Sequence, residues 1–243
     1  MRELDDQELS YFLATGIGRI LRGTRSGGLL AGRELAQVAT EVAQSWVDKV
    51  LSVHRPDDAM LSEDVSDDGS RLQASRVWII DVIDGTKEFS TGRADWAVHV
   101  ALVVDGVPTT CSVGLPDSKR VFRSDQVSYV DGPPSHTLVV SRSNPPMVAE
   151  RVAEAMEFKT RPMGSAGAKM LSVLLGDADA YVHAGGQYEW DQAAPAGVAL
   201  AAGLHCSRVD GSPLRFNKED PYSPDILVCR PELAEEIIRV AAR

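Results

Sequence analysis

Apolar residues recur at helical spacing through the first fifty positions of the chain. The pattern predicts two amphipathic helices, one over 5–23 and one over 35–53, with a glycine-rich joint at 26–28 between them. The first helix would begin beside the acidic pair Asp5 and Asp6, where negative charge is favourable, and end at Gly23. The apolar stripe of each helix is typical of packing against a core.

The pattern changes after these helices. A continuous apolar run at 77–80 predicts a strand buried on both faces, and the segments 96–104 and 107–115 predict a hairpin. Further strands are expected near 120–123, 127–130, 137–141, 180–183 and 226–229, and helices near 146–157, 165–175, 190–203 and 231–242. This mixture favours an α+β layered sandwich over a repeating βαβ fold. The breaker-rich loop 131–136 suggests two inseparable subdomains, 1–135 and 136–243.

Composition narrows the classes of protein that remain. The 243 residues are 44% hydrophobic and 25% charged, which excludes a disordered or collagen-like chain. The net charge of −10 disfavours binding to nucleic acid or to an anionic membrane. Three widely spaced cysteines without a CxxC pair favour a reducing compartment, and the acidic, polar start does not resemble a signal peptide. We therefore expect a soluble, cytoplasmic protein.

Candidate chemistry is concentrated where predicted elements end. The buried strand runs directly into Asp81, Asp84 and the Gly85-Thr86 turn. A second acidic pair follows an apolar stretch at 61–64, and Asp191 precedes a helix rich in small residues. Buried carboxylates are costly unless something compensates their charge, and a hard divalent cation such as Mg²⁺ prefers such oxygen ligands. Three acidic clusters at element ends predict one shared metal site more readily than three separate helix caps.

The spacing of residues within the segment 81–86 leads to two further expectations. Asp81 and Asp84 stand three positions apart, so in a regular strand they would face opposite sides and the chain must turn between them. The peptide carbonyl of Ile83 could then face the metal. Backbone N–H groups at Gly85 and Thr86 suit a phosphate, and the Thr86 hydroxyl can orient a water. Together these features indicate phosphoester hydrolysis assisted by two metal ions roughly 3.5–4 Å apart.

Three segments, taken together, resemble the signatures of the inositol monophosphatase superfamily. They are Leu-Ser-Glu-Asp at 61–64, Asp-Val-Ile-Asp-Gly-Thr at 81–86 and Trp-Asp-Gln-Ala-Ala-Pro at 190–195. The blocks 164–169 and 183–191 resemble one branch more closely, the CysQ-type 3′-phosphoadenosine 5′-phosphate phosphatases. The resemblance covers essentially the whole chain. It implies a layered αβαβα sandwich and a magnesium-dependent, lithium-sensitive phosphatase that removes the 3′-phosphate of this nucleotide and takes part in sulfate assimilation.

The resemblance also implies roles for individual residues. Glu63, Asp81, Asp84, Asp191 and the carbonyl of Ile83 would hold two Mg²⁺ ions, or three. Thr86, Glu63 and Asp84 would be the catalytic residues that activate and position the attacking water. Substrate contacts would come from Gly85, Thr86, Ser165, Lys169, His183 and Tyr188. For Lys169 an exposed position on a helix surface is an equal alternative, and a structural role is the main alternative for His183.

Three departures from the family pattern leave alternatives open. Asp64 stands where the family has Glu, and Val82 replaces a proline that would fix the turn. The early acidic residue that supports a third metal has no clean match, because Arg33 stands near its position. Glu34 could substitute for it, or Arg33 could meet a substrate phosphate directly. An inositol or sugar monophosphatase, another nucleotide phosphatase and an inactive metal-binding homologue remain alternative functions, and a homodimer stays open.

Overall fold

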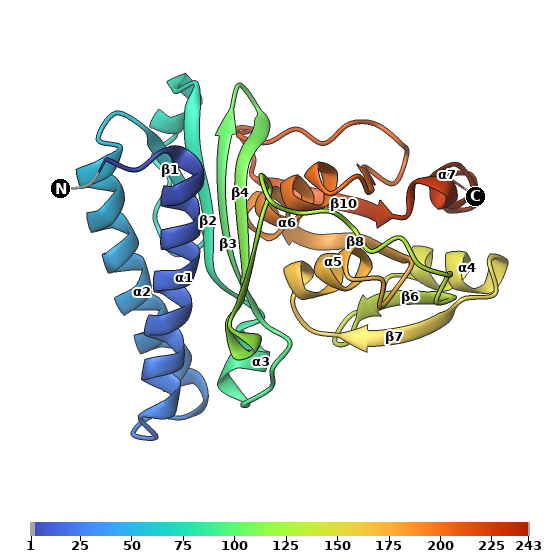
Figure 1. The fold of residues 1–243 in the computed structure, drawn as a ribbon, viewed down its shortest axis with the longest axis horizontal. Helices are drawn as coiled ribbons and strands as arrows, with labels where there is room; N and C mark the ends of the chain where they lie inside the picture. Colours follow the sequence, from blue (N-terminus) through green and yellow to red (C-terminus); the bar gives the residue numbers. More distant parts are fainter. Residues whose placement is uncertain (1–2, 243) are drawn as a thin grey trace.

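Two long helices lie side by side against one face of a sheet at one end of the molecule (Figure 1). They are α1 (Asp6–Ser26) and α2 (Gly32–His54) in a computed structural model that describes residues 3–242. Asp5 caps α1, and its carboxylate accepts from the backbone N–H of Glu8 at 2.7 Å. Each helix buries most of its predicted apolar stripe, as the spacing indicated. Phe12 of α1 and Val38 and Val42 of α2, which belong to these stripes, are exposed instead.

The first sheet has the strand order β1-β2-β3-β4-β5. Only β1 and β2 run parallel, and the other neighbours are antiparallel. Side chains alternate across β2, so Trp78 and Ile80 pack with α1 and α2, whereas Val77 and Ile79 pack on the opposite face. The strands are β1 (Ala59–Ser62), β2 (Arg76–Asp84), β3 (Ala97–Val104), β4 (Val107–Leu115) and β5 (Arg120–Arg123).

A middle pair of helices separates the first sheet from a second sheet. These helices are α5 (Ala166–Leu174) and α6 (Glu189–Ala201), and their residues form one core with the inner faces of both sheets. The second sheet has the order β7-β6-β8-β10-β9. Its strands are β6 (Thr137–Ser141), β7 (Lys159–Met163), β8 (Ala180–Tyr188), β9 (His205–Ser207) and β10 (Tyr222–Cys229).

The outer helices α4 (Met147–Ala155) and α7 (Ala234–Ala241) cover the far face of the second sheet through a third core cluster. The layers therefore run helix, sheet, helix, sheet, helix, which confirms the expected α+β sandwich (Figure 1). The short helix α3 (Thr86–Ser90) follows β2 directly. Three 3-10 turns complete the described chain: η1 (Ser70–Gln73), η2 (Pro116–Ser118) and η3 (Pro231–Leu233).

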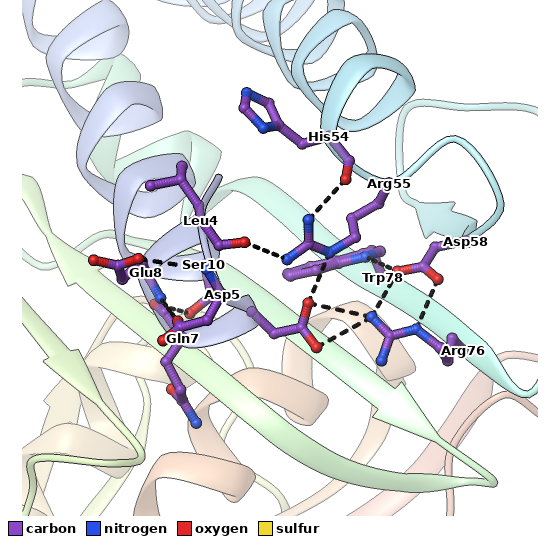
Figure 2. Close-up of polar contacts among 11 residues, drawn as sticks. Leu4, Asp5, Gln7, Glu8, Ser10, His54, Arg55, Asp58, Arg76 and Trp78 are labelled. Atoms are coloured by element: carbon purple, nitrogen blue, oxygen red, sulfur yellow. Dashed lines mark hydrogen bonds and ion pairs between the residues drawn. The ribbon is translucent and has the colours of Figure 1, made fainter. Parts of the chain in front are cut away.

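An ion network joins the start of α1, the end of α2 and the start of β2 (Figure 2). The carboxylate of Asp6 contacts Arg55 at 2.7 Å and Arg76 at 3.1 Å. Asp58 accepts from Arg76 and from the indole N–H of Trp78, both at less than 3 Å. Because Asp58 is mostly buried, these contacts are shielded from solvent. The network fixes the position of α2 along β2.

The structure departs from the expected elements in a few places. The segment 127–130 is not a strand. The backbone N–H groups of Tyr129 and Val130 bond instead to the carbonyls of Ala202, which follows α6, and Leu174, the last residue of α5. Its apolar residues pack on the core from a loop, which explains the misleading pattern. The first helix continues beyond Gly23 to Ser26, because a lone glycine does not end a helix whose next turn still bonds. No helix within residues 3–242 has the length and apolar character needed to cross a bilayer.

Candidate active site

A break in strand register brings two carboxylates of β2 to one place. β2 and β3 pair regularly up to Asp81, which lies opposite His99, and the register shifts before Asp84. This irregularity turns the chain between two residues that a regular strand would point to opposite faces. Asp191, in the first turn of α6, supplies a third carboxylate. One oxygen from each of the three lies within 4.8 Å of the other two.

Two of these carboxylates are held by backbone groups of their own segments. Asp81 accepts from the N–H of Ile83 at 2.9 Å, and Asp191 accepts from the N–H of Tyr188 at 2.7 Å. Each bond uses one carboxylate oxygen. Within the described part of the chain, the second oxygen of each group has no hydrogen-bond donor, so it remains available to a cation.

Asp84 is held by α5 and by β3. Its Oδ2 atom accepts from the hydroxyl of Ser165 at 2.5 Å and from the N–H of Gly167 at 2.7 Å. The Nε2 atom of His99 lies 3.1 Å from the same oxygen and forms an ion pair with it when the imidazole is protonated. His99 is fully buried, and its Nδ1 atom faces the carbonyl of Trp190 at 3.0 Å. All contacts fall on Oδ2, which leaves Oδ1 for a cation.

The environments of the three acids differ strongly. Burial, followed by the charges of its acidic neighbours, raises the pKa of Asp81 well above 3.8. Burial and the charge of Asp84 raise the pKa of Asp191 to about 7. Burial acts in the same direction on Asp84, but His99, Lys169 and the hydrogen bonds outweigh it and hold that pKa below its usual range. Two of the three acids therefore favour the protonated form unless a cation replaces the proton.

The donor set fits a hard divalent cation. Three carboxylates converge, each with one oxygen committed to the protein and one left over. Such oxygens suit Mg²⁺, which binds through a few carboxylates and keeps several waters. The positive charge would also relieve the repulsion that raises the pKa values of Asp81 and Asp191.

A cavity of about 800 Å³ adjoins the cluster. Glu63 lines it together with Asp64, Ile83 and Thr86, but Glu63 lies outside the group of acids that meet within 4.8 Å. Burial and the charges of Asp64 and Asp84 raise its pKa, so its carboxylate senses the cluster. The structure therefore brings Asp81, Asp84 and Asp191 together and places Glu63 on the adjoining wall.

Thr86, the second residue of the Gly85-Thr86 turn, lines this cavity beside Ile83. Gly85 has φ of 93° and leads into α3, a conformation that suits glycine. A Cβ atom there would come within 3.3 Å of the side chains of Ser165 and Trp96. The Thr86 hydroxyl donates to the carbonyl of Ile83 at 3.2 Å. A carbonyl oxygen has two lone pairs, so Ile83 keeps one acceptor position.

The residues expected to touch substrate on α5 and β8 are more deeply buried than their sequence suggested. Lys169 is 4% exposed, so the alternative of a solvated lysine is wrong; its Nζ atom donates to the carbonyl of Ser165 at 2.6 Å. Its ammonium lies over the ring of Tyr181, which stacks on His183. The His183 Nε2 atom contacts the carbonyl of Gly185 at 2.7 Å. Ser165, Lys169 and His183 are not among the described residues that line the 800 Å³ cavity.

Tyr188, by contrast, is 40% exposed at the end of β8. Its ring stacks on Trp190 with centroids 4.8 Å apart and an angle of 8°, and meets Tyr222 edge to face. Within this group, Tyr188 and Trp190 lie within three residues of Asp191 in the chain, and the backbone N–H of Tyr188 donates to Asp191. The stacked pair therefore lies beside the acid cluster.

Sequence reasoning missed two residues of this site. His99 holds Asp84, and Tyr181 carries both Lys169 and His183. The signal for His99 was present, because it is the one titratable residue in the apolar segment 97–104. A titratable group within such a strand needs a buried partner. Nothing in the sequence distinguished Tyr181 from an ordinary core aromatic.

The sequence matches the family model described as the inositol monophosphatase family over residues 10–243, which is nearly the whole chain. The chain belongs to the inositol monophosphatase family.

Named relatives match this chain to different extents. A 3′-phosphoadenosine 5′-phosphate phosphatase from Mycobacterium leprae is 47% identical, with 98% of this chain and 94% of the relative covered. The protein of that name from Mycobacterium tuberculosis is 48% identical over 86% of this chain and 82% of its own. The 3′(2′),5′-bisphosphate nucleotidase CysQ of Escherichia coli is 29% identical over 63% of this chain and 67% of the relative.

Solved structures of family members share the fold. CysQ from Bacteroides thetaiotaomicron superposes with a TM-score of 0.81 and 23% identity, covering 91% of this chain and 95% of that one. An inositol monophosphatase from Anabaena superposes with a TM-score of 0.78 and 19% identity, covering 97% and 94%. At this identity the likeness establishes the fold of the family alone.

Proposed function

We propose that this chain is a metal-dependent phosphomonoesterase that removes the 3′-phosphate of 3′-phosphoadenosine 5′-phosphate and yields AMP and inorganic phosphate. The choice of substrate rests on the 47% identity, over 98% of the chain, to a relative named 3′-phosphoadenosine 5′-phosphate phosphatase. The cluster of Asp81, Asp84 and Asp191 supports the reaction class, because its free oxygens suit the cations that phosphate chemistry uses.

Four acids and one carbonyl would hold the cations. Asp81, Asp84 and Asp191 form the inner group, Glu63 approaches from the cavity wall, and Ile83 offers its peptide oxygen. Bound Mg²⁺ ions, two in our proposal and a third left open, would supply Lewis-acid activation of water and neutralise phosphate charge.

Residues of this chain would position the reacting groups around that cluster. Thr86, which lines the cavity beside Glu63, would orient the attacking water through its hydroxyl. The backbone N–H groups of Gly85 and Thr86 would hold the phosphoryl oxygens. Ser165 would act on Asp84, to which it donates, so that the metal-facing oxygen keeps its direction.

The nucleoside end of the substrate would lie toward the aromatic side. The stacked pair of Tyr188 and Trp190 offers a flat face on which an adenine ring can stack. Lys169 and His183 lie deeper, so we propose that they support the shape of this side of the site and contribute to its electrostatic potential without touching the substrate. Sensitivity to Li⁺, a cytoplasmic location and a place in sulfate assimilation belong to the same proposal, and a homodimer stays open.

Steady-state phosphate release tests this function. The substrates are 3′-phosphoadenosine 5′-phosphate, inositol 1-phosphate and fructose 1,6-bisphosphate, each with Mg²⁺ and with EDTA. We expect a kcat/KM for the nucleotide at least about tenfold above either sugar phosphate, and no release in EDTA. Equal rates on the sugars would favour the alternative of a sugar phosphatase. Absence of release from all three would favour an inactive binding protein.

A further inference from the structure

Among the described residues that line the 800 Å³ cavity, one side chain is cationic. The cavity wall carries four carboxylates, those of Glu41, Asp48, Glu63 and Asp64, and the one cation among its described lining residues is Arg33. In a chain with a net charge of −10, a lone guanidinium in an acidic cavity stands out as a candidate for recognising an anion.

Arg33 reaches the cavity because one helical face of α2 forms its wall. The lining residues of α2 follow helical spacing: Arg33, Ala36, Gln37, Thr40, Glu41, Gln44, Ser45 and Asp48. Glu34, one position on, points about 100° away around the helix and is absent from the described lining. The structure therefore favours Arg33 over Glu34 as the residue of this turn that faces the site.

Two sets of contacts fix where Arg33 lies along α2 relative to β2. The ion network of Figure 2 holds the end of α2 beside the start of β2, so the helix and the strand run in opposite directions. Closer to the site, Ser62 donates to Gln44 at 2.8 Å, and Ser62 pairs with Ile80 of β2.

From that level, both elements lead to the Gly85-Thr86 turn. Arg33 lies eleven positions before Gln44, which is about 16 Å at helical rise. Thr86 lies six positions beyond Ile80, past the irregular end of β2 and at the start of α3. Arg33 and Thr86 therefore lie on the same side of the Gln44 level, and both line the cavity.

The guanidinium is free to bind a ligand. Arg33 is exposed, and across residues 3–242 no hydrogen bond or ion pair engages it, although Glu63 and Asp64 line the same cavity. Divalent cations at the acid cluster would repel it. A doubly charged phosphoryl group between the two would attract both, and arginine grips phosphate oxygens with two parallel hydrogen bonds.

We propose that Arg33 contacts the phosphoryl group undergoing hydrolysis, on the side opposite the metal cluster, and stabilises the charge that builds on its oxygens. The proposal rests on the proposed function for the identity of the phosphorylated substrate. It adds no bond-making step, since the water still supplies the oxygen and the alcohol still leaves. Arg33 binds the group that every substrate of this site must share.

Binding of inorganic phosphate tests the contact without turnover. Calorimetric titration of the Mg²⁺-loaded protein should give a Kd about tenfold or more weaker in Arg33→Ala than in wild type. Arg33→Lys should lie between them, because an ammonium cannot form the paired contact. Arg19→Ala is the matched control, since Arg19 is an exposed arginine of α1 outside this cavity, and it should bind like wild type.

Turnover gives a second, independent measurement. We expect kcat/KM for 3′-phosphoadenosine 5′-phosphate to fall about tenfold to a thousandfold in Arg33→Ala, with unchanged thermal stability. Added guanidinium ion should restore part of this rate in Arg33→Ala and none in Arg33→Lys. A residue with only a structural role would not respond to such rescue.

The outcomes separate this inference from the proposed function. If wild type releases phosphate but Arg33→Ala equals it in phosphate affinity and in rate, the inference fails and the function stands. A loss confined to substrates with a second phosphate would assign Arg33 to that group and overturn the inference. Weakened phosphate binding in a protein without turnover would support the contact and reject the function. Failure of wild type to bind phosphate would reject the contact.

Discussion

At Asp81 the demands of stability and function oppose each other. Its carboxyl is buried beside Asp84 and Asp191, and this environment raises its pKa. Asp81→Asn keeps the shape and removes the charge. We expect the metal-free variant to melt no lower than wild type, while Mg²⁺ no longer stabilises it and kcat falls about a hundredfold or more. Thermal melting with EDTA and with Mg²⁺, together with phosphate release, measures all three. A less stable but fully active variant would contradict this.

Asp58→Asn provides the control, because Asp58 lies just before β1 and contacts Arg76 at the other end of β2. Asp58 is mostly buried and accepts from Arg76 and Trp78, and these bonds hold its pKa low against the effect of burial. Loss of this ion pair should cost about 1–3 kcal/mol of unfolding free energy. Its kcat should match wild type, because the network lies at the start of β2 and the acid cluster at its end.

For single residues, the sequence indicated the acidic residues of the site but not the partners that hold their side chains in place. Asp81, Asp84 and Asp191 could be found because acids at the ends of apolar elements are conspicuous. The burial of Lys169 and the contact of His99 with Asp84 depend on the packing of α5 against β3. Residues so distant in the chain meet only through the tertiary fold, and a single sequence carries no record of such pairs.

At the scale of elements, the start of α5 fits closely against β3. A Cβ atom at Gly167 would lie far inside contact distance of the buried Nε2 atom of His99. Gly167→Ala should therefore displace either His99 or the turn that donates to Asp84. We expect a loss of about 1–3 kcal/mol in stability and a fall of about tenfold or more in kcat, measured by thermal melting and phosphate release.

Gly23→Ala is the matched control for Gly167→Ala, since it makes the same substitution in a helix away from the site. Gly23 lies within α1, and a Cβ atom there meets nothing within 4 Å. Alanine should stabilise the helix by about 0.5–1 kcal/mol and leave kcat unchanged. If Gly167→Ala behaved in the same way, the close packing of α5 on His99 would not matter for the site.

The elements that the sequence predicted well are those with a strong period or a distinct turn. The hairpin around Asp105-Gly106 and the strand 137–141 occur as expected. The strands β1, β7 and β9 were not predicted, since their segments AMLS, KTRPM and HCS contain few β-branched or aromatic residues. Such strands form because a neighbour in the sheet supplies their hydrogen bonds, which local sequence does not record.

At the scale of the whole molecule, the site depends on both halves of the chain. Glu63, Asp81 and Asp84 come from the first sheet and its loops, whereas Asp191 lies on α6 in the middle layer. The layer order followed from family resemblance, because periodicity alone predicts elements and not how they stack. The shared core of α5, α6 and both sheets supports our view that the halves 1–135 and 136–243 work as one unit.

The coupling of metal, protons and stability is a property of this whole unit. The pKa of Asp191 is raised to about 7 in the folded protein, so the metal-free fold binds a proton that the unfolded chain releases. That stabilisation is present at low pH and is lost as the pH rises through about 7. The raised pKa of His99 acts with the same sign: burial is the largest single effect and lowers this pKa, but the charge and hydrogen bond of Asp84, the carbonyl of Trp190 and the charge of Asp191 together outweigh it.

We therefore expect the melting temperature in EDTA to fall from about pH 4 to about pH 7, between the ordinary pKa of an aspartate and the raised pKa of Asp191. The increase caused by Mg²⁺ should grow over the same range, because the cation binds the ionised acids and stabilises the fold by mass action. Thermal melts in EDTA and in saturating Mg²⁺ at several pH values measure both trends, and Asp191→Asn should reduce both. A melting temperature in EDTA that rises over this range would show that Asp191 is ionised without a metal. The cluster would then need another source of positive charge.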